Sequence, residues 1–200
     1  MKYFIFMLFF CSFSFLSKGQ NARDFKPYCE SANLIYNQPK FFIDFIPQYS
    51  KKFFRYTSKK YIYPFQYNII DKDSSICIGF SVYNLNSKQD SDKIIQKLFP
   101  GRKVNNEYKL PIKHKADSIN HKINYYSYEK AEKLYNATIA GDYYMYNFEN
   151  PYEKRFFNCR IVFMHKDNVG DAEIYYFYNE KEKNRVDKLI EESYKMLYFK

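Results

Sequence analysis

Histidine is the residue type in this sequence with the widest chemical repertoire, because its ring changes charge near neutral pH and binds metal ions. The chain has three: His114, His121 and His165. Paired metal ligands usually follow a spacing such as H-E-x-x-H, and none of the three fits it. Each is followed by a lysine, whose positive charge disfavours a divalent cation nearby. The pattern therefore favours ordinary loop or strand-end histidines over a metal site.

A cysteine could act as a nucleophile if a histidine lay close enough to take its proton. Cys159 and His165 are the nearest such pair in the sequence, but along an extended strand they would be roughly 20 Å apart, at about 3.3 Å per residue. They cannot touch within one straight strand. A pairing of Cys29 or Cys77 with a distant histidine stays open. Cys77 and Cys159 lie in or beside apolar runs, however, where cysteine is usually inert core.

The number of cysteines also limits the disulfides. Cys11 lies in an apolar N-terminal run that we expect to be removed, which leaves Cys29, Cys77 and Cys159. Because this number is odd, at least one thiol stays unpaired within a monomer. One disulfide among the three stays open, while burial as small apolar side chains is the simpler expectation. No C-x-x-C pair occurs, so the sequence gives no sign of a zinc ribbon or a thioredoxin-like centre.

The acidic residues form two small clusters, Asp71 with Asp73 and Glu180 with Glu182. Their places in an expected turn and near an expected helix start explain both clusters without catalysis. The sequence has no G-x-G-x-x-G, P-loop or G-x-S-x-G motif. The triplet 136–138 matches a glycosylation sequon, which matters only in a eukaryotic secretory pathway. We therefore assign no catalytic residue, no cofactor and no metal ligand.

The segment Lys51–Tyr63 interleaves basic and aromatic residues without an acid. Neutralisation of phosphates combined with stacking on bases would use such residues. A half-buried segment, with its aromatic rings toward the core and its lysines reaching water, explains the same pattern. Because we expect the chain to be exported, nucleic acid is an unexpected partner. Anionic lipid headgroups, lipopolysaccharide or an acidic envelope protein are favoured instead.

The N-terminus has the pattern of a cleavable export signal. The first two residues form a short positive region, and residues 3–16 then run without a charge. This run is shorter than the roughly 17–20 apolar residues that span a membrane. Ser17 and Gly19 supply the small residues that signal peptidase requires, which predicts a signal peptide over 1–19 and a mature N-terminus at Gln20. We therefore expect the protein in the periplasm or outside the cell.

Residues 20–200 have the length of a single domain, and no internal repeat or Gly/Ser-rich linker divides them. The whole chain has a formal net charge of +10. Removing Lys2 and Lys18 from 32 basic residues, against 22 acidic ones, leaves +8 for the mature chain. A basic protein of this kind favours acidic partners without identifying one.

The first half of the chain is expected to begin a sheet, with strands over 32–36, 41–46, 62–70 and 76–83. The last two form a hairpin around a polar turn over 71–75. A short helix, capped by Ser91 or Asp92, is expected to extend through Phe99 and to end at Pro100. The polar stretch 103–120 contains Pro111 and is expected to be a loop.

The second half adds strands over 123–128, 142–148, 156–165 and 172–178. One or two helical turns are expected over 129–135. From about Glu180, residues recur at the spacing of one helix face, namely Val186, Leu189, Ile190, Ser193, Met196 and Leu197. The charges opposite this face are mixed, which favours docking on the sheet over a membrane surface. Mostly antiparallel strands with helices at a few positions predict an α+β fold.

Some of these segments bear a family resemblance. The residues 63–80, then Asn158–Lys166, then Leu197–Phe199, follow an order of elements that resembles the PsbP-like superfamily of α/β/α sandwiches. The chain also looks like uncharacterised exported proteins of Bacteroidota-type bacteria, in which a pair such as Asn136-Ala137 precedes a strand and one such as His165-Lys166 ends it. The resemblance to PsbP-like domains implies an accessory or partner-binding role.

Two classes of function follow from the sequence. An exported binding or accessory domain of the cell envelope is favoured. A secreted hydrolase, with a site assembled from scattered residues, is the alternative. A deep polar cleft that gathers a histidine or thiol with a carboxylate would favour the hydrolase. A contiguous aromatic or basic surface would favour binding.

Overall fold

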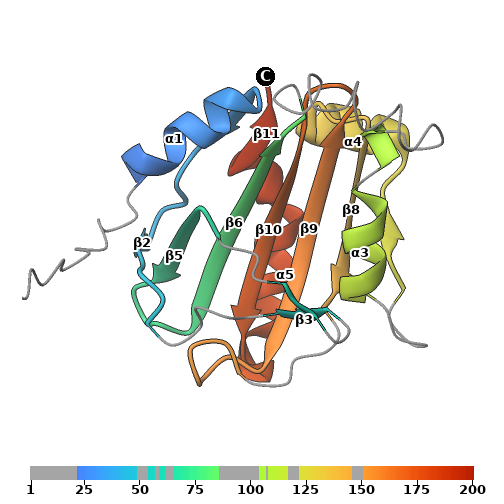
Figure 1. The fold of residues 1–200 in the computed structure, drawn as a ribbon. Coiled ribbons are helices and arrows are strands. Elements are labelled where there is room, and N and C mark those ends of the chain that lie inside the picture. Colours follow the sequence, from blue (N-terminus) through green and yellow to red (C-terminus); the bar gives the residue numbers. More distant parts are fainter. Residues whose placement is uncertain are drawn as a thin grey trace, which may run out of the picture.

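The computed structural model describes residues 22–48, 54–56, 59–61, 65–85, 104–106, 108–116, 122–145 and 151–200. Seven strands form one antiparallel sheet, in the order β2-β5-β6-β10-β9-β8-β7 (Figure 1). Their bounds are Phe42–Asp44 for β2, Tyr67–Asp71 for β5, Ile76–Asn84 for β6, Gly170–Tyr178 for β10, Asn158–Lys166 for β9, Ile139–Tyr144 for β8 and Asn124–Tyr125 for β7.

Two further pairs of strands lie among the described residues. β1 (Leu34–Tyr36) pairs with β11 (Leu197–Phe199), which brings the two ends of the described chain together. β3 (Phe54–Tyr56) pairs with β4 (Lys59–Tyr61). All of these pairings are antiparallel. Together with the helices, they confirm the predicted α+β class.

The sheet separates two cores, because successive side chains of a strand point to opposite faces. On β10, Ile174 and Tyr176 belong to one core, and Tyr175 and Phe177 belong to the other. The first core is covered by α1 (Ala22–Ser31), α4 (Tyr128–Tyr135) and α5 (Lys183–Glu191). The second is covered in part by α3 (Lys109–Ala116), which lies on the near side in Figure 1, while α5 lies on the far side. The described residues also form the short 3-10 helices η2 (Val104–Asn106), η3 (Glu180–Glu182) and η4 (Ser193–Lys195).

The predicted hairpin is confirmed as β5 and β6. Its turn is closed by Asp71, whose carboxylate accepts hydrogen bonds from the backbone N–H groups of Ser75 at 2.7 Å and Ile76 at 3.0 Å. The long strands β9 and β10 are also confirmed, and the helical turns over 129–135 form α4. β8 begins and ends earlier than its expected range of 142–148. The helix expected over 91–99 lies outside the described residues.

The loop expected over 103–120 is a wrong prediction, since that stretch contains η2 and α3. Pro111 is the third residue of α3, and a proline in the first turn removes no helical hydrogen bond. The N-terminal helix α1 was not expected either. It contains Pro27, which disfavours a helix, yet Phe25 and Cys29 lie one turn apart and are both buried in the first core.

The C-terminal helix is confirmed but is shorter than its pattern suggests. α5 ends at Glu191, and η4 follows it. Met196 and Leu197 fit the helical spacing, but Leu197 pairs with Tyr36 in the β1–β11 ladder. The Asn37 N–H donates to the Met196 carbonyl at 2.8 Å. Leu197 therefore pairs with a residue 161 positions earlier in the sequence instead of extending the helix.

Candidate functional site

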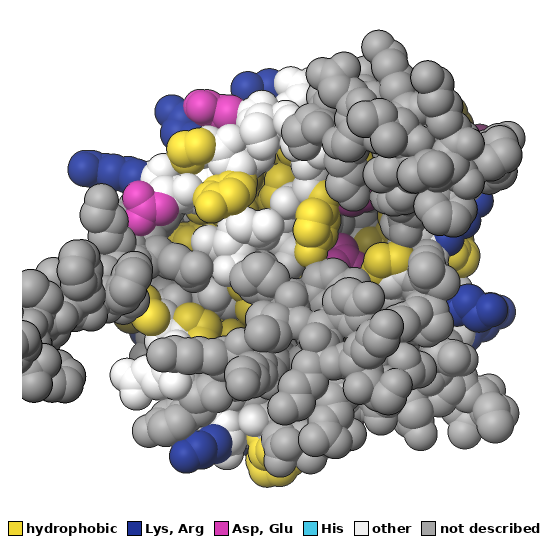
Figure 2. All heavy atoms as spheres, in the orientation of Figure 1, with side chains coloured by type: hydrophobic (Ala, Val, Ile, Leu, Met, Phe, Trp, Pro, Cys, Tyr) yellow, Lys and Arg dark blue, Asp and Glu magenta, His cyan; other side chains and the backbone are white. Residues whose placement is uncertain are grey.

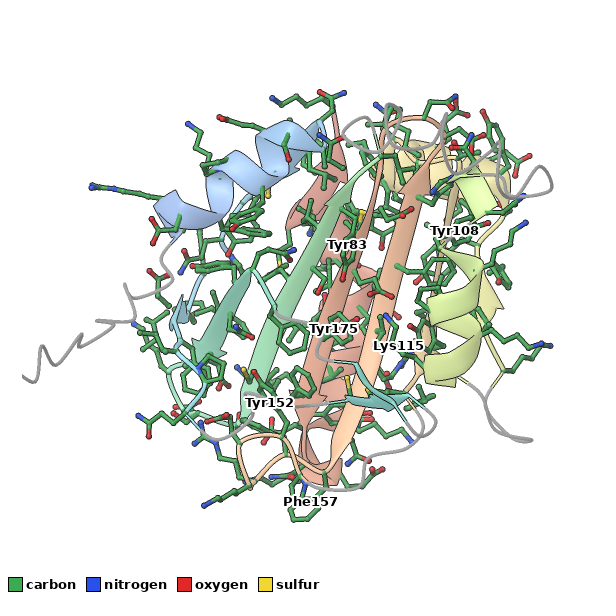
Figure 3. All side chains as sticks on the ribbon, viewed as in Figure 1. Tyr83, Tyr108, Lys115, Tyr152, Phe157 and Tyr175 are labelled. Carbon is green, nitrogen blue, oxygen red and sulfur yellow. The ribbon has the colours of Figure 1, made fainter. Side chains whose placement is uncertain are left out.

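The second core contains a buried charged pair, which the sequence did not indicate. Lys115 comes from α3, and Glu173 comes from β10. The Lys115 ammonium donates to both Glu173 oxygens, with the Oε2 contact at 2.5 Å, and to the Tyr175 hydroxyl at 2.8 Å. Figure 3 shows Lys115 and Tyr175 facing each other between α3 and the sheet. The three N–H bonds of the ammonium group therefore each have an acceptor.

Two tyrosines complete the cluster around Glu173. The Tyr175 hydroxyl donates to Glu173 Oε2 at 2.5 Å, and the Tyr143 hydroxyl of β8 donates to Oε1 at 3.4 Å. Burial lowers the pKa of Lys115, although the neighbouring Glu173 charge acts in the opposite direction. A lysine with a lowered pKa could serve as a nucleophile if it faced a substrate. Here Lys115 is almost fully buried and holds α3 against the sheet.

His165 forms a second polar cluster on the same face of the sheet. Its ring is buried near the end of β9, with Nδ1 2.6 Å from Asp171 Oδ1 and Nε2 2.9 Å from Asp167 Oδ1. Tyr108, just before α3, stacks on the ring at a centroid distance of 4.4 Å. Burial opposes the charged ring, but the two aspartates outweigh it and raise the pKa of His165.

This geometry bears on the metal and general-base interpretations of the histidines. Both ring nitrogens of His165 already contact carboxylates, so neither is open to a metal ion or a substrate proton. Among the residues that the structure describes, no three His, Cys, Asp or Glu side chains gather as metal ligands. His114 lies in α3 with its side chain outside the description, and His121 lies wholly outside it.

The three cysteines Cys29, Cys77 and Cys159 are free and buried. The disulfide that the sequence left open is therefore not formed. Burial raises the pKa of Cys29 to about 12 and raises those of the other two well above the usual thiol range. Cys159 and His165 are separated along β9 by Ile161 and Phe163, which are buried in the same core. All three thiols are thus held in the protonated, weakly nucleophilic form.

The acidic clusters have structural roles, as the sequence indicated. Asp71 closes the β5–β6 turn and accepts from Arg185 of α5 at 2.7 Å. Burial opposes its ionisation, but hydrogen bonds from Ile76 and Ser75 outweigh this and lower the pKa of Asp71. Glu180 and Glu182 lie in η3, directly before α5. Arg185 Nη1 also lies 3.6 Å from Glu182 Oε2, so this one guanidinium joins the two acidic clusters.

The basic and aromatic segment Lys51–Tyr63 contains the β3–β4 hairpin. In its register Phe54 faces Tyr61, and Arg55 faces Lys60. The side chains of this hairpin and the rest of the segment lie outside the description. Its half-buried and nucleic-acid-binding interpretations both remain predictions.

Exposed apolar side chains gather instead at the β2 end of the sheet. Phe41, Ile43 and Ile46 are 70%, 52% and 45% exposed, within six consecutive residues. Lys40 and Lys72 are exposed beside them, with Lys72 Nζ 5.8 Å from the centre of the Phe41 ring. We call these five residues the β2 edge patch. Figure 2 shows apolar side chains at the left-hand side of the molecule, where β2 lies in Figure 1.

Sequence reasoning missed both the charged pair and this patch. Glu173 carried one signal, because it precedes Tyr175 and Phe177 at strand spacing and so shares their inward face. Nothing in the sequence marked Lys115 among so many lysines. The comparisons add no further assignment, since no protein-family model, curated protein or solved structure matches this chain. In the described part, no helix combines the length and apolar character needed to cross a membrane.

Proposed function

We propose that this protein is an exported, non-catalytic binding or accessory domain of the cell envelope. One observation carries the proposal. The described side chains best suited to catalysis, namely the three thiols, His165 and Lys115, are buried, and His165 and Lys115 are engaged by carboxylates. Several large apolar side chains are exposed at the same time. Catalytic groups must reach a substrate, whereas binding surfaces present apolar groups to water.

The partner class follows from charge. The mature chain would have a net charge of +8, so an acidic envelope protein or anionic headgroups would be attracted to it, and nucleic acid is disfavoured by export. An accessory role is also what the resemblance to PsbP-like sandwiches implies. The α+β sheet with helices on both faces is compatible with that resemblance.

The experiment is a comparison of binding and catalysis with the same purified mature protein. Binding is measured by co-sedimentation with envelope fractions and with anionic and zwitterionic vesicles, at low and high salt. Catalysis is measured with chromogenic ester, peptide and glycoside substrates. We expect salt-sensitive binding and no turnover above buffer. Turnover that is lost in His165→Gln or Lys115→Met, while the variant stays folded, would replace this proposal with the secreted hydrolase.

A further inference from the structure

Phe41 has a backbone conformation that its side chain does not favour. It is the third residue of a turn closed by the hydrogen bond from the Phe42 N–H to the Pro39 carbonyl at 3.3 Å. Its φ is 70°, in the left-handed region where glycine is usual at this position. A bulky residue with positive φ is a strained exception. The Phe41 ring is mostly exposed, so burial in the core does not compensate for the strain.

The strand that follows Phe41 lies at the end of the sheet. β2 is the outermost described strand beside β5, and no described strand pairs with its other side. The Phe42 N–H and carbonyl are satisfied locally, by the Pro39 carbonyl and by Gln38 Nε2 at 3.0 Å. Antiparallel pairing alternates, so the backbone groups of Asp44 also point away from β5. A short stretch of edge is therefore available for an added strand.

Exposed cations lie around this edge. Lys40 and Lys72 are exposed beside Phe41, and the Lys72 N–H donates to the Phe41 carbonyl at 3.1 Å. Arg155 is also exposed, with its guanidinium 6.0 Å from the ring of Phe45, which follows β2. The Asp44 carboxylate, the acid on the strand itself, accepts a hydrogen bond from the Tyr67 hydroxyl. Lys40, Lys72 and Arg155 would thus attract an acidic partner segment, although the carboxylates of Asp44 and Asp73 are also exposed there.

We infer that the β2 edge patch binds an extended, acidic segment of a partner polypeptide, with Phe41 as its apolar anchor. This inference rests on the proposed binding function and names its site and partner class. Strand addition supplies backbone hydrogen bonds at Asp44, and apolar side chains of the partner pack on Phe41 and Ile43. Lysines 40 and 72 select acidic side chains. The strained backbone conformation of Phe41 holds its ring outward, where a partner can contact it.

The decisive variant is Phe41→Gly, because it removes the ring and the strain together. Its urea midpoint should equal or exceed that of wild type, since glycine adopts positive φ without cost. The probe is a fluorescein-labelled ten-residue peptide that alternates glutamate and valine, measured by fluorescence anisotropy at low salt. A peptide that alternates lysine and valine is the charge control. Phe157→Ala is the matched protein control, since Phe157 is 64% exposed at the start of β9.

We expect saturable binding of the glutamate peptide, weakened at least about tenfold in Phe41→Gly and in Lys40→Glu/Lys72→Glu, and unchanged in Phe157→Ala. Absence of wild-type binding, equal binding by Phe41→Gly, or equal binding of the lysine peptide would overturn the inference. Loss of vesicle binding in Phe41→Gly, without any peptide binding, would assign the patch to lipid and overturn it too. If Phe41→Gly still bound envelope fractions, the proposed binding function would hold, but the β2 edge patch would not be its site.

Discussion

At the scale of single residues, the buried Lys115 and His165 side chains each contact carboxylates. The Lys115–Glu173 pair lies under α3, and His165 lies between two aspartates at the end of the same face. Taking such groups out of water is costly, and their mutual attraction offsets that cost only when the geometry is good. The three hydrogen bonds of the Lys115 ammonium group meet this requirement. These contacts join α3, and Tyr108 just before it, to the sheet.

Removing one member of the pair should leave a buried charge unpaired, which removing both avoids. Glu173→Leu leaves the buried Lys115 ammonium without its carboxylate, and Lys115→Met leaves the buried Glu173 carboxylate without its ammonium. Each variant should therefore lower the free energy of unfolding by about 3–5 kcal/mol. The double variant should lose clearly less than the sum, because no charge is left unpaired. Urea denaturation of the four proteins measures this coupling. Strictly additive losses would show that the two side chains do not interact.

The raised pKa of His165 predicts a pH dependence of stability. A group with a higher pKa in the folded state stabilises fully below its unfolded pKa of about 6.5, and this contribution is lost as the pH rises through the folded value. The stability difference between wild type and His165→Gln should therefore shrink as the pH rises from about 6.5 through the raised pKa of the folded state. Urea midpoints across this range measure it. A difference that stays constant with pH would contradict a charged His165.

At the scale of elements, α5 is attached to the sheet by both apolar and ionic contacts. Val186 and Ile190 are fully buried, whereas Leu189 is only partly buried against the same core. Arg185 reaches Asp71, and Asp187 pairs with Arg160 of β9. The sequence pattern placed both Leu189 and Ile190 on the buried face. In the structure, Ile190 is the more deeply buried of the two.

Truncation along α5 should follow burial. Ile190→Ala should lower the free energy of unfolding by about 2–5 kcal/mol. The removed atoms no longer leave water on folding, and a cavity remains in the core. Leu189→Ala should cost about half as much, because less of its side chain leaves water on folding. The exposed Glu192→Ala should change stability by less than about 0.5 kcal/mol. Urea midpoints decide the order, and equal values for Ile190→Ala and wild type would mean that α5 does not contribute to the core.

At the scale of the whole molecule, the two described chain ends meet. β1 follows α1 and pairs with β11, so the N-terminal helix and the C-terminal strand stabilise each other. The Lys200 N–H donates to the Asn33 carbonyl at 2.8 Å. Loss of either end should therefore weaken both. Cleavage at the predicted site after Gly19 would leave the whole of α1 in place, because this helix begins at Ala22.

The proposed export predicts the N-terminus of the mature protein. Expression in a Gram-negative host, followed by mass spectrometry of the secreted or periplasmic protein, should find a chain that begins at Gln20 or its pyroglutamate form. The physical reason is the charged start, the uncharged run over 3–16 and the small residues before the cleavage site. A cytoplasmic protein that retains Met1 would contradict the export assignment. A Lys18→Ala variant, which keeps Ser17 and Gly19, is the control and should be cleaved at the same place.

The sequence alone determined what depends on neighbours along the chain. Continuous apolar and aromatic runs in β9 and β10, and the polar turn between β5 and β6, specify strands and a hairpin, so the α+β class follows from them. The tertiary structure decided what depends on distant partners. α1 forms despite Pro27 because its apolar face is buried, and residues 197–199 form a strand because β1 pairs with them. Lys115 and Glu173 are 58 positions apart, so only folding could bring them together.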